Sequence, residues 1–582
     1  MDCLQLKYYI NCLFPKTGKR KYYWMNRVKR IFNVLILLLV IFFFSNYSVI
    51  AQASMYSAQG WQLEDYRTDS VFGAGVNKAY EDLLRNKKSY PVIVAVLDAG
   101  VDTAHEDLVG HIWTNTREIP GNGIDDDHNG YVDDIHGWNF LGGKDGRNIT
   151  VESYESYREY FRLKNDSVWE ESGDVNSKKF YREKVKKYFL KDSLQQVQSV
   201  FLLNQLIPQM RDADSIFKLN LHKDSVYVRD VTDFQTADTA LSRLKKNTLM
   251  YFKRYGITPD MSLGSFIREA EEYLQTSRQK LKYFSGDPDA LRREIVGDDF
   301  NNINDKSYGN NNVAAGTPSH GTHVSGIIAA SRGNGKGMDG IDAQVYIMAL
   351  RAVPDGDERD KDVALGIRYA VDNGARIVNM SFGKYFSPGK SWVDDAVKYA
   401  EAHDVLLVDA AGNEFQNLDS ISHYPNPVYE SSGRNSCCWI TVGANTGGPD
   451  SLILARFSNY GKKEVDLFAP GVKVYSTVPG NQYASYSGTS MAAPVVTGIA
   501  ALLLEYYPQL SASQLKYILT HAVLKIPDNQ VKWPSNGQWV DFNQLSASGG
   551  IVNAYNALLL AATMKGERKI VKKTKIQGLN KD

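Results

Sequence analysis

Short apolar segments alternate with helical patterns in the C-terminal half of the chain, and this alternation limits the fold more than any other feature. The apolar segments cover 345–350, 376–380 and 405–408, and amphipathic segments at 361–373 and 392–403 separate them. Strands that alternate with helices form a parallel sheet with helices on both faces. We therefore predict an α/β fold of three layers around a parallel central sheet.

Two of the predicted strands end in polar side chains. The segment Pro91–Leu97 is apolar on both faces and runs into Asp98, and the strand at 405–408 leads to Asn413. The carboxyl end of a buried parallel strand is where α/β folds place functional groups, although a strand-terminating turn also favours aspartate. Asp409 interrupts the second strand, and because a buried acid is costly unless it is paired, we expect it to have a partner.

A lone serine, Ser490, precedes a long apolar helical pattern at 495–504. A hydroxyl at the N-terminus of a helix lies where developing negative charge is stabilised. A nucleophilic serine also needs a base, and a capping turn before a core helix is the alternative interpretation. The serine therefore has to be judged together with the rest of the chain.

Two histidines, His320 and His323, open another helix of small and apolar residues. No glutamate lies between them, so the zinc-protease pattern His-Glu-x-x-His is absent. A histidine can instead serve as a general base for a serine.

An acid, a base, a nucleophile and an amide donor are thus available in Asp98, His320, Ser490 and Asn413. The histidine can take the proton of the serine, and the acid can hold the imidazole in one tautomer. The asparagine and the N–H of the serine can bind the oxyanion of a tetrahedral intermediate. The order Asp, His, Ser along the chain is one of the known orders of such triads.

Five segments in this order resemble the motifs of the subtilisin-like serine peptidases, or subtilases. They are Val94–Asp102, His320–Gly326, Asn379–Gly383, Ala410–Asn413 and Gly488–Pro494. The resemblance implies a serine endopeptidase with a subtilisin-like fold and polypeptide substrates, in which His320 is the base and His323 is structural. It also implies that Ser381, Phe382 and Gly383 bind substrate beside the S1 pocket, and that no cofactor takes part in catalysis.

An acidic loop at 122–134 predicts a structural calcium site. Alternating oxygen donors and a glycine turn suit a calcium loop, and a solvated acidic turn is the alternative. The twelfth position is His136 rather than glutamate, so the match to an EF-hand loop is incomplete. The candidate ligands are Asp125, Asp127, Asn129 and Asp133, with Asp107 added because the resemblance implies a calcium-binding acid there.

The resemblance divides the chain into a catalytic domain at 54–145 and 301–563, a helical insertion at 146–300 and a basic tail at 564–582. Within the insertion two apolar stripes recur at helical spacing, so we expect amphipathic helices packed on one another. Two roles are open for the insertion: binding a partner, or acting as an intramolecular chaperone in place of a prodomain. The stripes are Leu190, Leu194, Val197 and Phe201, and Ile267, Ala270, Leu274 and Leu281.

Residues 1–53 have the form of an export signal, with Met25 as a possible true start. A basic segment at 25–30 precedes an apolar segment at 34–44 and a small-x-small site at 51–53. The apolar segment is shorter than the roughly 20 residues of a membrane span, so we expect none after signal cleavage. The protein is predicted to be periplasmic or extracellular, and its net charge of +1 gives no reason to expect nucleic-acid binding.

Two other functions compete with the peptidase. One is a binding or scaffolding module in which the insertion recognises a partner and cleavage is absent. The other is a lipase or esterase, which requires Gly-x-Ser-x-Gly, whereas the serine here lies in Gly-Thr-Ser-Met-Ala. The adjacent Cys437 and Cys438 are expected to be buried on a strand without forming a disulfide.

Overall fold

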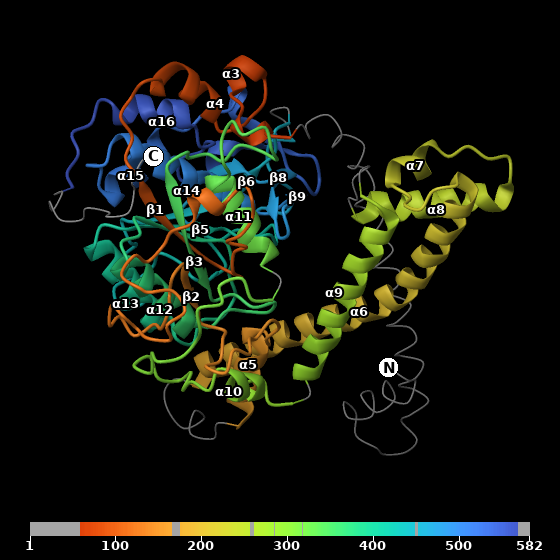
Figure 1. Ribbon diagram of the computed structural model, residues 1–582, viewed down its shortest axis with the longest axis horizontal. Helices are drawn as coiled ribbons and strands as arrows, with labels where there is room; N and C mark the ends of the chain where they lie inside the picture. The colour runs from red at the N-terminus through yellow and green to blue at the C-terminus, as the bar shows by residue number, and fades with distance from the viewer. Residues whose placement is uncertain are drawn as a thin grey trace. The chain divides into compact units, whose positions relative to one another are not determined.

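The computed structural model describes residues 59–165, 175–255, 261–284, 286–316, 318–448 and 452–568. The predicted export signal at 1–53 and most of the basic tail at 564–582 lie outside these residues. Figure 1 shows how the described elements are arranged.

The core of the molecule is a seven-stranded sheet in the order β2-β3-β1-β4-β5-β6-β7. All of its neighbouring strands are parallel, which confirms the predicted parallel sheet. Two antiparallel hairpins, β8–β9 and β10–β11, lie outside this sheet. The strands are β1 (Val92–Asp98), β2 (Gly137–Asn139), β3 (Val345–Arg351), β4 (Ile377–Met380), β5 (Leu406–Ala410), β6 (Trp439–Asn445), β7 (Leu467–Pro470), β8 (Val474–Val478), β9 (Gln482–Tyr486), β10 (Gln530–Lys532) and β11 (Trp539–Asp541).

Helices cover both faces of the sheet, so the predicted three-layer α/β architecture is confirmed. Along β1, Val94 and Val96 belong to the apolar core beneath α11 and α14, whereas Ala95 and Leu97 belong to the core beneath α12 and α13. This alternation follows from the pleat of a strand that is buried on both faces. The helices of these layers are α11 (Ser319–Ala329), α12 (Asp360–Asp372), α13 (Lys390–Ala402), α14 (Thr489–Tyr506), α15 (Ala512–His521) and α16 (Ala554–Ala561).

Among the described helices, α14 alone is long and apolar enough to cross a membrane, and 89% of its apolar window is buried. Its burial in the core accounts for its composition.

Between β2 and α11 the chain forms a set of helices that includes the predicted insertion. Both ends of this insertion contact the catalytic domain through buried ion pairs. Glu155 lies 2.7 Å from Lys384, and Arg292 lies 2.8 Å from Asp362. The helices are α5 (Glu155–Asn165), α6 (Val175–Leu221), α7 (Val228–Asp233), α8 (Thr239–Tyr255), α9 (Leu263–Tyr283) and α10 (Ala290–Ile295).

The predicted packing of the two insertion stripes is right for one stripe and wrong for the other. Ile267, Ala270 and Leu274 of α9 are buried, and they share a core with α6. Leu190, Leu194, Val197 and Phe201 of α6 are instead exposed. The reason is that α6 carries a second stripe, and that stripe packs in the core with α9: Val200, Leu203, Ile207 and Met210.

The adjacent cysteines also differ from the prediction. Cys438 is buried but Cys437 is exposed, and both precede β6 rather than lying within it. Their sulfur atoms are 3.5 Å apart and both thiols are free.

Candidate active site

The sheet order brings three predicted site segments to one edge. Strands β1, β4 and β5 are neighbours, and their carboxyl ends are followed by Asp98, Ser381 and the segment to Asn413. The site is therefore positioned by backbone that is held on both sides by other strands.

Asp98 and His320 are in direct contact. The Nδ1 atom of His320 lies 2.8 Å from Oδ1 and 3.0 Å from Oδ2 of Asp98. The carboxyl group is buried and also accepts a hydrogen bond from the N–H of Ala99. Burial lowers the pKa of His320, but the attraction of the Asp98 carboxylate outweighs it, so the pKa is raised above its ordinary value of 6.5. Because Nδ1 is occupied, Nε2 is the nitrogen left to act as a base.

Ser490 is the second residue of α14, which begins at Thr489, ahead of the apolar segment that predicted the helix. Its hydroxyl donates a hydrogen bond to the carbonyl oxygen of Ser381 at 3.1 Å. The hydroxyl of Ser381 donates in return to the carbonyl oxygen of Ser490 at 2.9 Å. These two bonds fix the first turn of α14 against the end of β4, and rotation about the Cα–Cβ bond of Ser490 can turn its hydroxyl away from Ser381.

Asn413 is oriented by the residue before the serine. Its Oδ1 accepts hydrogen bonds from the N–H of Thr489 at 2.9 Å and from the Thr489 hydroxyl at 3.2 Å. A Cβ placed on Gly488 would lie 3.5 Å from Nδ2 of Asn413 and 3.6 Å from the backbone nitrogen of Ser490. The two N–H donors are therefore adjacent to one small space, which is the arrangement an oxyanion requires.

His323 does not join this group. It is buried, its Nε2 lies 3.0 Å from the carbonyl oxygen of Ala484, and its ring stacks on Tyr486. Burial lowers its pKa to about 3, so the ring is neutral at physiological pH. Its contacts are those of a packed core side chain.

A further histidine, His423, fills the space beside the predicted substrate-binding segment Ser381, Phe382 and Gly383. A Cβ on Gly383 would lie 2.0 Å from Cε1 of His423, and one on Gly412 would lie 3.2 Å from its Nε2. The imidazole is therefore wedged between the segment after β4 and the segment after β5. Its pKa is lowered by burial, against the opposing charge of Glu414. No sequence pattern pointed to this residue, because it lies on a loop outside the five motifs.

One carboxyl oxygen of Asp409 lacks the partner expected for this buried acid. Among the described residues, its Oδ1 has no hydrogen-bond partner, although the side chain is 1% exposed. Burial and the nearby charge of Glu358 raise the pKa of Asp409 well above its ordinary value. The predicted partner is therefore missing at Oδ1, and protonation is a second way to reduce the cost of burying this acid.

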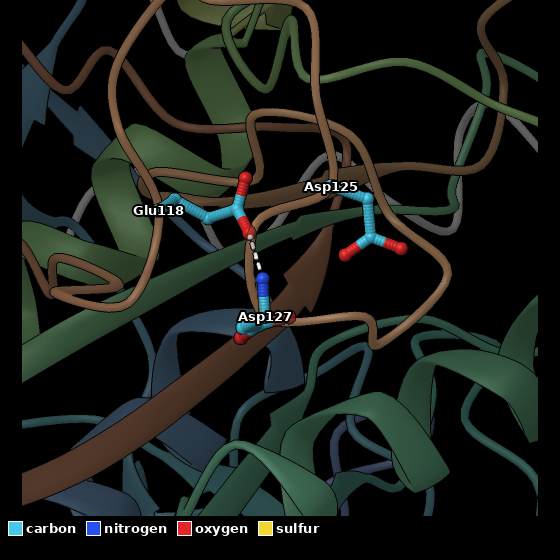
Figure 2. A group of neighbouring side chains, drawn as sticks. All are labelled: Glu118, Asp125 and Asp127. Atoms are coloured by element: carbon cyan, nitrogen blue, oxygen red, sulfur yellow. Dashed lines mark hydrogen bonds between the residues drawn. The ribbon is translucent and has the colours of Figure 1, made fainter.

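The acidic loop brings together only part of the predicted ligand set. Carboxylate oxygens of Glu118, Asp125 and Asp127 lie within 4.8 Å of one another (Figure 2). Glu118 was not predicted, because it precedes the alternating pattern. Its Oε1 accepts from the N–H of Asp127 at 3.1 Å, and Arg117 lies 2.9 Å from Asp127.

The remaining predicted ligands have other contacts. Asp133 accepts from the backbone N–H groups of Gly121 and Gly123, and Asn129 accepts from that of Tyr131. Asp107 lies apart from this cluster and accepts a hydrogen bond from Asn334 at 2.6 Å. Alternation in sequence therefore did not distinguish acids that face one another from acids that close backbone turns.

Comparisons with known proteins agree on one family. The sequence pattern described as the subtilase family matches residues 90–545. Subtilisin DY of Bacillus licheniformis is 37% identical over 212 residues, which is 36% of this chain and 72% of that protein. Thermitase of Thermoactinomyces vulgaris is 35% identical over 276 residues, covering 47% of this chain and 84% of thermitase. The thermophilic serine proteinase of Bacillus sp. (strain AK1) is 43% identical over 185 residues, covering 32% of this chain and 42% of that protein.

Proposed function

Because this chain belongs to the subtilase family of serine endopeptidases, we propose that it hydrolyses peptide bonds through Asp98, His320 and Ser490, with Asn413 as an oxyanion donor. The observation that supports this best is the contact between Asp98 and His320 at the edge of the sheet that also carries Asn413 and the first turn of α14. A binding module without catalysis would have no need of this arrangement.

The residues divide the reaction in the following way. Nε2 of His320 takes the proton of the Ser490 hydroxyl while Oγ attacks the carbonyl carbon of the scissile peptide. Nδ2 of Asn413 and the N–H of Ser490 donate to the oxyanion. His320 then gives the proton to the leaving amine, and a water molecule, deprotonated by the same nitrogen, releases the acyl group. Asp98 stabilises the imidazolium that forms in both steps.

Substrate lies extended along Ser381, Phe382 and Gly383. Backbone pairing there orients the peptide, and the space for the side chain before the cleaved bond is bounded by the same segment and by the segment after β5. His423 occupies part of this space, which favours small over large side chains at that position.

Calcium binding is the second part of the proposal. The three carboxylates of Glu118, Asp125 and Asp127 fit a hard cation, although Arg117 competes for Asp127. The ion would hold the loop at 118–134 closed and takes no part in catalysis. Chelation should lower the melting temperature of the wild type but not that of the double variant Asp125→Asn, Asp127→Asn; equal shifts in both would remove the loop as the site.

Export to the periplasm or the cell exterior is proposed from the sequence of residues 1–53 alone. Detection of the protein in a whole-cell fractionation, with its mature N-terminus read by mass spectrometry, tests the signal, and a translated peptide from residues 1–24 would exclude a start at Met25. An intact N-terminus in the cytoplasm would contradict export.

An intramolecular chaperone role for residues 146–300 is supported only by the buried ion pairs at the two ends of the insertion. If deletion of this segment leaves refolding yield and activity unchanged, that role is excluded.

A fluorophosphonate probe tests the catalytic assignment. The wild type should be labelled at Ser490, the variant Ser490→Ala should not be labelled, and the variant Ser487→Ala should be labelled like the wild type. Absence of serine-dependent labelling in a folded protein would overturn the proposed mechanism.

A further inference from the structure

The longest helix of the insertion, α6, exposes a continuous apolar face. Four of its residues, which we call the exposed α6 seam, are Leu190, Leu194, Val197 and Phe201, and they are 50%, 56%, 40% and 62% exposed. Four large apolar side chains in one row on a helix surface mark an interaction site rather than scattered surface residues.

The spacing of the seam indicates a helical partner. Its residues are separated by four, three and four positions, which is the a/d pattern of a coiled coil. The buried stripe of α6, which includes Val200, Ile207 and Met210, packs in one core with α9. Helix α6 therefore carries two apolar stripes, and the described residues bury only one of them.

The charges around the seam limit what can pack on it. No charged residue occurs from Ser193 to Met210, so the second half of the seam is flanked by glutamine, serine and asparagine. Lys186 and Lys187 precede the seam, and Lys191 and Asp192 follow its first residue. The face is thus apolar and neutral at one end and basic at the other.

We propose that the exposed α6 seam is a dimerisation surface on which α6 of a second copy packs in the antiparallel direction. A two-fold axis between Leu194 and Val197 places Leu194 against Val197 of the second copy, and Leu190 against Phe201 of the second copy. Each larger side chain then meets a smaller one. Parallel pairing would instead place each seam side chain against its own copy, so that Phe201 meets Phe201 and Leu190 meets Leu190.

Other occupants fit the face less well. An extended peptide has a side-chain period of two, which does not match a seam spaced by three and four. Anionic membranes attract apolar helices whose polar face is rich in lysine and arginine, whereas no lysine or arginine occurs from 193 to 210, which holds three of the four seam residues. A second copy of the same neutral seam is self-complementary without any further partner.

Sedimentation of the full chain tests the proposal, with Ser490→Ala present throughout to prevent self-cleavage. We expect a monomer–dimer equilibrium, and Leu194→Glu should raise the dimer dissociation constant at least about tenfold. Leu219→Glu is the matched control, since Leu219 is a 74% exposed leucine of the same helix outside the seam, and it should leave the constant unchanged.

The direction of packing is tested by charge pairing. Val197→Lys alone should weaken the dimer as Leu194→Glu does, and the double variant should recover at least half of the lost affinity, because opposite charges then face each other only in antiparallel packing. A monomer at all concentrations, a dimer insensitive to these changes, or binding of the seam to lipid vesicles or to another protein instead of a second copy would overturn the proposal. Labelling of Ser490 is measured separately, so the dimer can fail while the peptidase assignment stands.

Discussion

The catalytic edge of the sheet and the helical insertion differ in which side chains they bury and which they expose. At the catalytic edge, each polar side chain is held by another element: Asp98 by His320, Ser381 by the first turn of α14, and Asn413 by Thr489. In the insertion, charged groups are buried where it joins the catalytic domain, and apolar side chains are exposed on α6.

The difference teaches what each region is built for. A network of short hydrogen bonds between strand ends fixes atoms for chemistry, which tolerates little displacement. Buried ion pairs hold a joint only while both partners are present, because removal of one leaves an uncompensated charge. An exposed apolar seam does not stabilise the isolated chain. It contributes a favourable free energy only when another surface covers it and removes it from water. The predictions below separate these three cases, beginning with the largest effect.

Replacing Ser490 by alanine should abolish turnover while leaving the fold intact. We expect kcat/KM to fall by roughly 10⁶-fold, since the nucleophile acts as a unit with its base. The melting temperature should change by less than about 2 °C, because the hydrogen bond from the Ser381 hydroxyl to the carbonyl oxygen of residue 490 remains. A peptide substrate and a thermal melt measure both, and residual activity within tenfold of the wild type would place the chemistry elsewhere.

Replacing Asn413 by leucine should lower kcat by about 10²–10³-fold with little change in KM, since an oxyanion donor acts in the transition state. The variant Thr489→Val is the control, because it removes a hydroxyl that contacts Asn413 without removing the donor. A rise in KM with unchanged kcat would show that Asn413 binds the ground state instead.

The buried ion pairs that join the insertion to the catalytic domain form a joint whose loss of charge should lower the stability of the protein most. Lys384 is buried, directly follows the substrate-binding segment, and lies 2.7 Å from Glu155 and 2.9 Å from Asp360. Lys384→Met should lower the free energy of unfolding by about 3–5 kcal/mol, because Asp360 loses its cation and Glu155 is left with Arg158 alone.

Lys398→Met is the matched control for this joint, since Lys398 pairs with Asp395 at 3.2 Å on the exposed side of α13. It should change the stability by less than about 1 kcal/mol. If urea titrations show that both variants lose the same free energy of unfolding, the buried ion pairs of Lys384 stabilise the protein no more than an exposed pair does.

The sequence predicted the two regions unequally, and the reason is physical. Strand ends and helix starts are marked in sequence by Asp98, Asn413 and Ser490, because a polar residue next to a long apolar segment lies where the buried strand or helix ends or begins. Helical spacing is a weaker guide: α6 carries two stripes, and the sequence does not say which one another helix covers. The environment of Asp409 was misjudged and Glu118 was missed, because protonation state and loop closure depend on neighbours that are distant in the chain.

The pH dependence of catalysis should follow His320. Because the imidazole must be neutral to accept a proton, kcat/KM should rise with pH, and the midpoint should lie above 6.5, since Asp98 raises the pKa of His320. Below that midpoint each unit of pH should cost about tenfold in rate. An acid limb with a midpoint below 6.5, or a rate that falls as pH rises through 7, would contradict the contact between Asp98 and His320 as the controlling pair.

The smallest expected effect concerns the choice of substrate. His423→Gly should open the space between Gly383 and Gly412, because the imidazole is the group that a side chain at either position would meet. The preference for a phenylalanine over an alanine before the cleaved bond should increase about tenfold or more, as expected when a pocket gains several methylene volumes. Matched peptide pairs that differ only at this position measure the ratio, and Tyr385→Phe, which removes a hydroxyl but leaves a neighbouring ring in place, is the control. If the ratio is unchanged in a His423→Gly variant whose melting temperature stays near that of the wild type, His423 does not line the pocket that selects the side chain before the cleaved bond.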